Sequence, residues 1–128
     1  MRTLRLASNK ARRPVSTRGA LDETRLRRVR DYVEAHLADD LSLAALAAVA
    51  CLSPSRFIHS FKAATSISPW AWVTRLKITR AQELLRNTDH PLAQIALACG
   101  FTSQSHFTNA FKRATGLAPS RWRVQARS

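Results

Sequence analysis

The sequence predicts an all-α protein of about seven helices, built as two helix-turn-helix lobes that a long linker helix joins. Two observations carry this prediction. Apolar residues recur at three- and four-residue spacing along most of the chain after residue 20, which is the period of a helix with one buried face. The last quarter of the chain also repeats the middle, so one helical unit occurs twice.

The repeat relates residues 53–72 to residues 103–122, and the same side chains recur fifty positions apart. The matched pairs are Ser53/Ser103, Ser55/Ser105, Phe57/Phe107, Phe61/Phe111, Lys62/Lys112, Thr65/Thr115, Pro69/Pro119 and Trp72/Trp122. Just upstream the offset is forty-nine, so one copy has one extra residue between its two helical stretches. Two copies are too few for a stacked solenoid, which needs three or more. We therefore interpret the repeat as a duplicated helical unit with a variable turn.

The chain before the repeat contributes a basic arm and one helix. Residues 1–20 carry six Arg or Lys residues and no acid, with almost no periodic apolar pattern, so we expect a flexible arm. Apolar residues from Leu26 to Leu37 then recur at helical spacing and predict an amphipathic helix. This helix begins the first lobe, which we assign to residues 21–67.

The first copy of the repeat supplies the other helices of the first lobe. Ser42 can cap a helix over residues 43–50, because a serine hydroxyl accepts a hydrogen bond from a first-turn amide. After a short turn, Ser53 and Pro54 begin another helix that runs to about residue 64. Two helices joined by so short a turn must cross steeply.

A linker helix follows within residues 68–87. Ser68 and Pro69 begin it, and the apolar pattern extends to about Arg86. At about 1.5 Å per residue such a helix spans about 27 Å, so it can act as a rigid spacer between the lobes.

The second lobe is assigned to residues 88–124, and residues 125–128 are expected to form a tail. Residues that favour turns or helix starts mark its boundaries at Pro91, Gly100, Ser103, Gly116 and Pro119. Three helices are expected, and the middle one runs over residues 104–115.

The charge of the chain indicates a polyanionic partner. The chain has 21 Lys and Arg residues against 8 Asp and Glu residues, a net charge of +13 and a pI of about 11.6. A polyanion would offset the self-repulsion, and nucleic acid is the partner that we expect. The apolar residues are needed for internal packing, and no run of about 18 apolar residues occurs, so no membrane partner is expected.

The cysteines and histidines do not indicate catalysis or metal binding. Cys51 and Cys99 lie near corresponding points of the two copies, and we expect buried thiols in a reduced cytosol. Neither has a Cys or His neighbour at metal-ligand spacing, and the four histidines are scattered, so no metal or other cofactor is expected. Because no Ser-His-Asp or Gly-rich phosphate motif accompanies them, we also exclude an enzyme.

One set of residues carries a family resemblance. In the second copy this set is Ile95, Ala96, Cys99, Gly100, Phe101, Ser103, Gln104, Ser105, His106, Phe107, Ala110, Phe111, Lys112, Gly116, Pro119, Trp122 and Arg123. In the linker it is Arg75, Leu76, Ala81, Leu84 and Leu85. Together these residues closely resemble the carboxy-terminal signature of the AraC/XylS family of transcription regulators, and the similarity covers residues 24–124. The resemblance implies two homeodomain-like lobes, each placing a recognition helix in a major groove of double-stranded DNA.

The resemblance also has consequences for the whole protein. Cys51 and Ser66 stand where glycine is common in the family, and Asn109 stands where relatives often carry arginine. Most members have a separate effector-binding and dimerising domain, and no such segment occurs in this sequence. The chain therefore looks like the stand-alone branch, whose cytoplasmic, nucleoid-associated members bind asymmetric sites as monomers and contact RNA polymerase. An excised DNA-binding domain of a longer regulator fits equally well.

Base contacts are expected from the amino-terminal half of each recognition helix, because that end points into the major groove. The candidates in the second lobe are Gln104, Ser105, His106, Thr108 and Asn109, and those in the first are Ser55, Ile58 and His59. Gln104 and Asn109 can pair bidentately with adenine, and His106 can donate to guanine. Ile58 can touch a thymine methyl. The alternatives are helix capping for Gln104 and Ser105, a solvent-facing or phosphate-facing ring for His106, and rim packing for Ile58.

Contacts to the DNA backbone are expected from basic residues. The candidates for phosphate contact are Lys62, Arg75, Lys77, Arg80, Lys112 and Arg113. Arg56 is a contact of unspecified kind, because a guanidinium pairs with guanine or with phosphate. The alternative for each of these residues is a solvated surface charge.

The predicted function is sequence-specific regulation of transcription through double-stranded DNA. The alternative is a non-specific architectural DNA- or RNA-binding protein, which the charge allows but the polar, capped recognition helices disfavour. The repeated Phe and Trp residues have helical spacing and are expected in the core. This disfavours a reader of single strands, which would expose its aromatic rings.

Overall fold

The computed structural model describes residues 20–39 and 41–128, and within these it contains seven helices and no strand. The helices are α1 (Glu23–Ala35), α2 (Leu43–Val49), α3 (Pro54–Thr65), α4 (Pro69–Asn87), α5 (Leu92–Ala98), α6 (Gln104–Thr115) and α7 (Pro119–Ala126). The all-α prediction is confirmed. Of the predicted basic arm, residues 1–19 lie outside the described residues.

The helix starts follow from local hydrogen bonds. Ser53 caps α3 by accepting a bond from the Arg56 amide at 3.3 Å, and Ser103 caps α6 by accepting one from the His106 amide at 3.0 Å. Ser42 and Ser68 cap α2 and α4 in the same way. Proline at the first turn of α3 and α4 adds to this signal, because its fixed φ suits a helix start.

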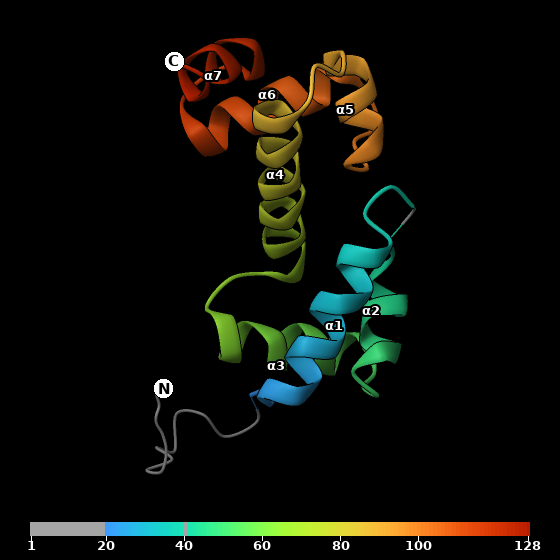
Figure 1. Ribbon diagram of the computed structural model, residues 1–128. Helices are drawn as coiled ribbons and strands as arrows, with labels where there is room; N and C mark the ends of the chain where they lie inside the picture. The colour runs from blue at the N-terminus through green and yellow to red at the C-terminus, as the bar shows by residue number, and fades with distance from the viewer. Residues whose placement is uncertain (1–19, 40) are drawn as a thin grey trace.

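The chain forms two hydrophobic cores, one in each lobe, and α4 contributes to both. Trp72 and Val73 of α4 pack into a core with residues of α1, α2 and α3. Farther along the same helix, Ala81 and Leu85 pack into a second core with residues of α5 and α6. Figure 1 shows α3 and α6 lying crosswise at opposite ends of α4. With 19 residues, α4 spans about 28 Å, so the spacer length agrees with the sequence prediction.

Each helix-turn-helix turn has a residue in the left-handed backbone region. Cys51 has φ 60° and Gly100 has φ 82°, and the two residues follow the C-caps of α2 and α5. Ser66 and Gly116 end α3 and α6 with φ 69° and 87°. The α2 and α3 axes are bent by 73° across the first turn, which confirms the steep crossing.

The prediction that both thiols are buried is wrong for Cys51, which is exposed, whereas Cys99 is buried. The two cysteines lie near corresponding points of the repeat, and the backbone pairs Cys51 with Gly100 and Ala50 with Cys99. Ala50 and Cys99 are both fully buried C-caps. Cys51, in the left-handed position, is therefore outside the core that Ala50 joins.

Helix α7 closes the second lobe against the C-terminal end of α4. Arg123 donates to the carbonyls of Leu85, Thr88 and His90 at 3.1, 3.2 and 2.9 Å, so it satisfies acceptors at and beyond the helix end. Arg127 pairs with Asp89 at 2.7 Å, and this hydrogen bond lowers the pKa of the Asp89 carboxyl. The segment 125–128, expected as a tail, therefore includes the end of α7 and an arginine packed on α4.

Over the described part of the chain, no single helix has the length and apolar character needed to cross a membrane, and only α2 and α3 taken as a bent pair pass by length and composition.

Candidate nucleic-acid interface

Helices α3 and α6 present the same outer positions to solvent. The corresponding residues, fifty apart, are Ser55/Ser105, Arg56/His106, Ile58/Thr108, His59/Asn109 and Lys62/Lys112. All are exposed except Thr108, which is half-buried. The opposite faces are anchored by Phe57 and Phe61 in α3 and by Phe107 and Phe111 in α6, each 0% exposed. Because the rings fix each helix in rotation, the outer side chains face away from the lobe.

The turn before α6 restrains His106. The extra residue of the second copy is Thr102, because Phe101 aligns with Leu52 and Ser103 with Ser53. The Thr102 hydroxyl lies 3.3 Å from His106 Nδ1, and the Phe101 ring packs edge-on against the imidazole with centroids 5.3 Å apart. An imidazole held on two sides has less rotamer freedom to lose on binding.

The polar residues Gln104 and Ser105 at the start of α6 do not cap the helix. Ser103, not Gln104 or Ser105, accepts the capping bond. Gln104, Ser105 and Asn109 are exposed. Capping, the alternative for Gln104 and Ser105, is therefore performed by their neighbour.

The outer face of α3 is less polar than that of α6. Ile58 is 41% exposed and is the only large apolar side chain on this face that the described residues expose to that degree. A shallow hollow of about 520 Å³ lies beside it, lined by Ser55, Ile58, His59, Lys62 and Ala63. A second hollow, of about 360 Å³, is lined by Ser55, Arg56, His59 and Ser60. This surface can contact an apolar group through Ile58 and a hydrogen-bonding group through the polar side chains beside it.

The basic candidates fall into three situations. Lys62, Lys112 and Arg113 are exposed in the last turns of α3 and α6, and Arg75 is exposed on α4. Arg80 is exposed but pairs with Glu83 at 3.1 Å, which offsets part of its charge. Lys77 is half-buried.

Lys77 is already engaged within the protein. Its Nζ donates to the Gly100 carbonyl at 2.9 Å and lies 5.4 Å from the centroid of the Phe101 ring. The ammonium therefore lies between α4 and the turn of the second lobe. A phosphate contact by Lys77 stays a prediction, and it would have to compete with these bonds.

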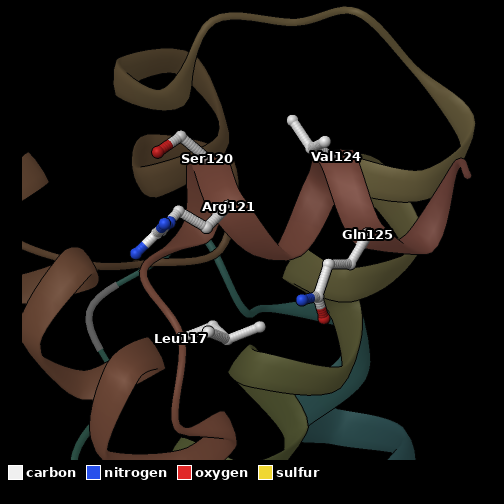
Figure 2. Close-up of a pocket in the computed structure, with 5 residues that line it drawn as sticks. All are labelled: Leu117, Ser120, Arg121, Val124 and Gln125. Atoms are coloured by element: carbon white, nitrogen blue, oxygen red, sulfur yellow. The ribbon is translucent and has the colours of Figure 1, made fainter.

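Sequence reasoning did not single out the outer face of α7. A hollow of about 540 Å³ is lined by Leu117, Ser120, Arg121, Val124 and Gln125. Figure 2 shows Leu117 and Gln125 extending toward one another across this hollow, while Arg121 extends to the other side. Ser120 and Arg121 lie in the first turn of α7, a position in which a cation can contact a phosphate.

Metal and thiol chemistry find no support in the described residues. No group of three His, Cys, Asp or Glu side chains among them is arranged to hold a metal ion. Burial raises the pKa of the Cys99 thiol to about 11, so this sulfur is protonated and inert near neutral pH.

Comparison with known proteins identifies the family. A protein-family model described as a helix-turn-helix domain matches residues 46–125 of this chain. An AraC-type DNA-binding regulator from Chromobacterium violaceum has a TM-score of 0.76 and 28% identity, covering 81% of this chain and 93% of that chain. The chain belongs to the AraC/XylS family.

Two further similar proteins bear on the function of this AraC/XylS-family chain. The DNA-binding domain of AdpA, solved in complex with a target DNA, has a TM-score of 0.75 and 29% identity, covering 80% of this chain and 92% of that chain. The probable transcriptional regulator LumQ of Photobacterium leiognathi is 40% identical over 75 residues. This match covers 59% of the present chain, and the chain spans 30% of the length of LumQ.

Proposed function

We propose that this AraC/XylS-family chain is a sequence-specific regulator of transcription that binds double-stranded DNA, with α3 and α6 reading adjacent major grooves. One observation carries the proposal: the two recognition helices repeat the same outward positions, yet fill most of them with different hydrogen-bonding or apolar side chains. Repetition of geometry suits two equivalent grooves, and difference in chemistry suits two different half-sites.

The types of side chain differ between the two ends of each helix, and this difference supports base contact at one end and phosphate contact at the other. Gln104, His106 and Asn109 lie in the first half of α6, whereas Lys112 and Arg113 lie in its last turns. Polar groups with directional bonds can specify bases, whereas cations at the rim fix position. On α3, we assign base contacts to Ser55, Ile58 and His59. We assign a phosphate contact to Lys62. Arg56 retains a contact of unspecified kind.

The partners follow from this assignment. A single chain carries both reading helices, so it binds its site as a monomer, and the site is asymmetric. Contact with RNA polymerase and action in the cytoplasm are parts of the same proposal. Catalysis is not proposed, because the family and the similar structures are transcription regulators.

Selection of bound sequences from a random duplex library, followed by footprinting with a stoichiometry measurement, tests the proposal. We expect one chain to protect two neighbouring major-groove segments on one face of the duplex, about 34 Å apart. Six to ten phosphate contacts would give a log-log salt slope of about −5 to −9.

Each alternative outcome has a distinct meaning. Failure to enrich any sequence, with a steep salt slope retained, would replace the proposal by non-specific architectural binding. Tighter binding to RNA than to every selected duplex would favour an RNA partner. Two chains on a palindrome would contradict the monomeric, bipartite reading.

A further inference from the structure

The two lobes meet at a second place besides the linker helix. Gly100, in the turn of the second lobe, lies so close to Leu37, just beyond α1 of the first lobe, that a Cβ on Gly100 would stand 1.9 Å from the Leu37 carbonyl oxygen. Figure 1 shows the C-terminal ends of α1 and α5 directed toward one another beside α4. The backbone of one lobe therefore packs directly on the backbone of the other.

Lys77 reaches this contact from the middle of α4. Its Nζ donates to the Gly100 carbonyl at 2.9 Å, its Cε lies 3.3 Å from where a Gly100 Cβ would be, and its ammonium faces the Phe101 ring. The bond joins residues 23 positions apart and fixes the second turn to α4 at the level where the lobes touch.

In the segment of α4 around Lys77, the helix packs least against the two hydrophobic cores. Of the buried residues of α4, Val73 is the last in the first core and Ile78 is the first in the second. Between them, no fully buried side chain of α4 belongs to either core, and only half-buried Leu76 packs on the first. Without a contact beside α4, bending or twisting of one lobe against the other would be resisted by the helix alone.

We propose that Lys77 and Gly100 form an interlobe clamp, which fixes the distance and rotation between α3 and α6 and thereby sets the number of base pairs between the two half-sites. Lys77 is then a positioning residue and not a phosphate contact. Only the effect of the clamp on the spacing of the DNA half-sites rests on the proposed function. One added base pair moves a half-site by about 3.4 Å and rotates it by about 35°, so a rigid pair of lobes must reject altered spacings.

Spacing variants of the selected site test the clamp. The full chain is titrated with the best duplex and with duplexes that gain or lose one base pair between the half-sites. We expect the wild type to lose at least about tenfold in affinity on either change, because it or the DNA must deform. Lys77→Met should lower this penalty to less than about threefold while it keeps the base preference within each half-site.

Matched substitutions separate the clamp from loss of charge. Lys112→Met also removes one ammonium, but it should weaken binding to all spacings alike. Lys77→Arg keeps a donor and a cation beside Phe101 and should retain the wild-type spacing preference. If Lys77→Met fails to fold, Lys77→Gln, which is too short to reach the carbonyl, provides the second variant. An unchanged spacing penalty in Lys77→Met or Lys77→Gln would overturn the clamp, as would a wild type indifferent to spacing.

A measurement without DNA keeps the clamp distinguishable from the proposed function. Spin labels on exposed Cys51 and on Val124→Cys, which replaces an exposed residue of α7, report the distance between the lobes in a Cys99→Ala background. Pulsed electron paramagnetic resonance should give a narrow distance distribution for the wild-type lysine and a clearly broader one for Lys77→Met. Equal widths would overturn the clamp even if specific DNA binding is found. A broadened width would support it even if no specific site exists.

Discussion

Cys51 and Gly100 occupy the same left-handed backbone position in the turns of the two lobes, at φ values of 60° and 82°. Glycine adopts this conformation at no steric cost, whereas a residue with a Cβ is strained there by about 1 to 2 kcal/mol. Both turns therefore have a left-handed residue directly after the C-cap of the preceding helix, and the first copy holds this conformation under strain.

Replacement of Cys51 by glycine should stabilise the protein. Relief of strain exceeds the entropy that an additional glycine gives to the unfolded chain, so we expect a net gain of about 0.5 to 1 kcal/mol. Because Cys51 is exposed, little packing is lost. Urea denaturation measures the gain. Cys51→Ala is the control, since it also removes the thiol but keeps a Cβ, and an equal gain from it would contradict the strain argument.

Gly100→Ala should destabilise the protein far more than Gly116→Ala. Both glycines have φ above 80°, but a Cβ on Gly100 meets the Leu37 carbonyl, whereas one on Gly116 meets nothing within 4 Å. We expect a loss of about 3 kcal/mol or more for Gly100→Ala and about 1 to 2 kcal/mol for Gly116→Ala. Denaturant midpoints of the two variants check the difference, and equal losses would mean that the lobes do not touch there.

Arg123→Met should weaken the junction of α4 and α7. It removes the charged donor to the carbonyls of Leu85 and His90 and leaves the Thr88 carbonyl with Arg127 as its remaining arginine donor, and we expect a loss of about 2 kcal/mol in the free energy of unfolding. Arg121→Met, on the exposed side of the same helix, should cost no more than about 0.5 kcal/mol. Thermal unfolding by circular dichroism compares the two, and similar shifts would assign the effect to helix propensity.

The pKa of Cys99 predicts a loss of stability in alkali. Burial raises this pKa from 9.0 to about 11, so the folded state holds a proton that the unfolded state has released between these values. The stabilisation from the neutral thiol is full below pH 9 and is lost as the pH rises through about 11, by up to about 3 kcal/mol. Cys99→Ala should flatten this part of the stability curve. A variant with the same slope as the wild type would place the titration on another group.

Gln104→Ala and Lys112→Ala should affect DNA binding in different ways. Loss of a base-reading amide is expected to cost about 1 to 3 kcal/mol on the best site and to relax the preference at one or two base pairs. Loss of a phosphate-contacting ammonium should weaken specific and random DNA alike and lower the salt slope by about 1. Titration of both duplexes at several salt concentrations separates the two. Equal losses for Gln104→Ala on both DNAs would reassign it to backbone contact.

The sequence by itself determined the features that depend on neighbours along the chain. Serine caps, prolines at first turns and apolar spacing act within one or two helical turns, so the helices and the two-lobe arrangement were predicted and are confirmed. The helices proposed for recognition, α3 and α6, were also placed along the chain, because the duplication aligned Phe57 with Phe107 and Phe61 with Phe111. The base and phosphate contacts assigned to their outer residues stay predictions.

The tertiary structure decided what depends on residues that are remote in sequence. The sequence predicted that both thiols are buried, but Cys51 follows the C-cap of α2 and is exposed, whereas Cys99 is the C-cap of α5 and is buried. The bond from Lys77 to Gly100 spans 23 positions and that from Arg123 to Leu85 spans 38. No local pattern encodes such contacts, because they exist only once the lobes have packed on α4. The sequence predicts a phosphate contact for Lys77, and that contact stays a prediction, but only the fold shows that its ammonium donates to the Gly100 carbonyl.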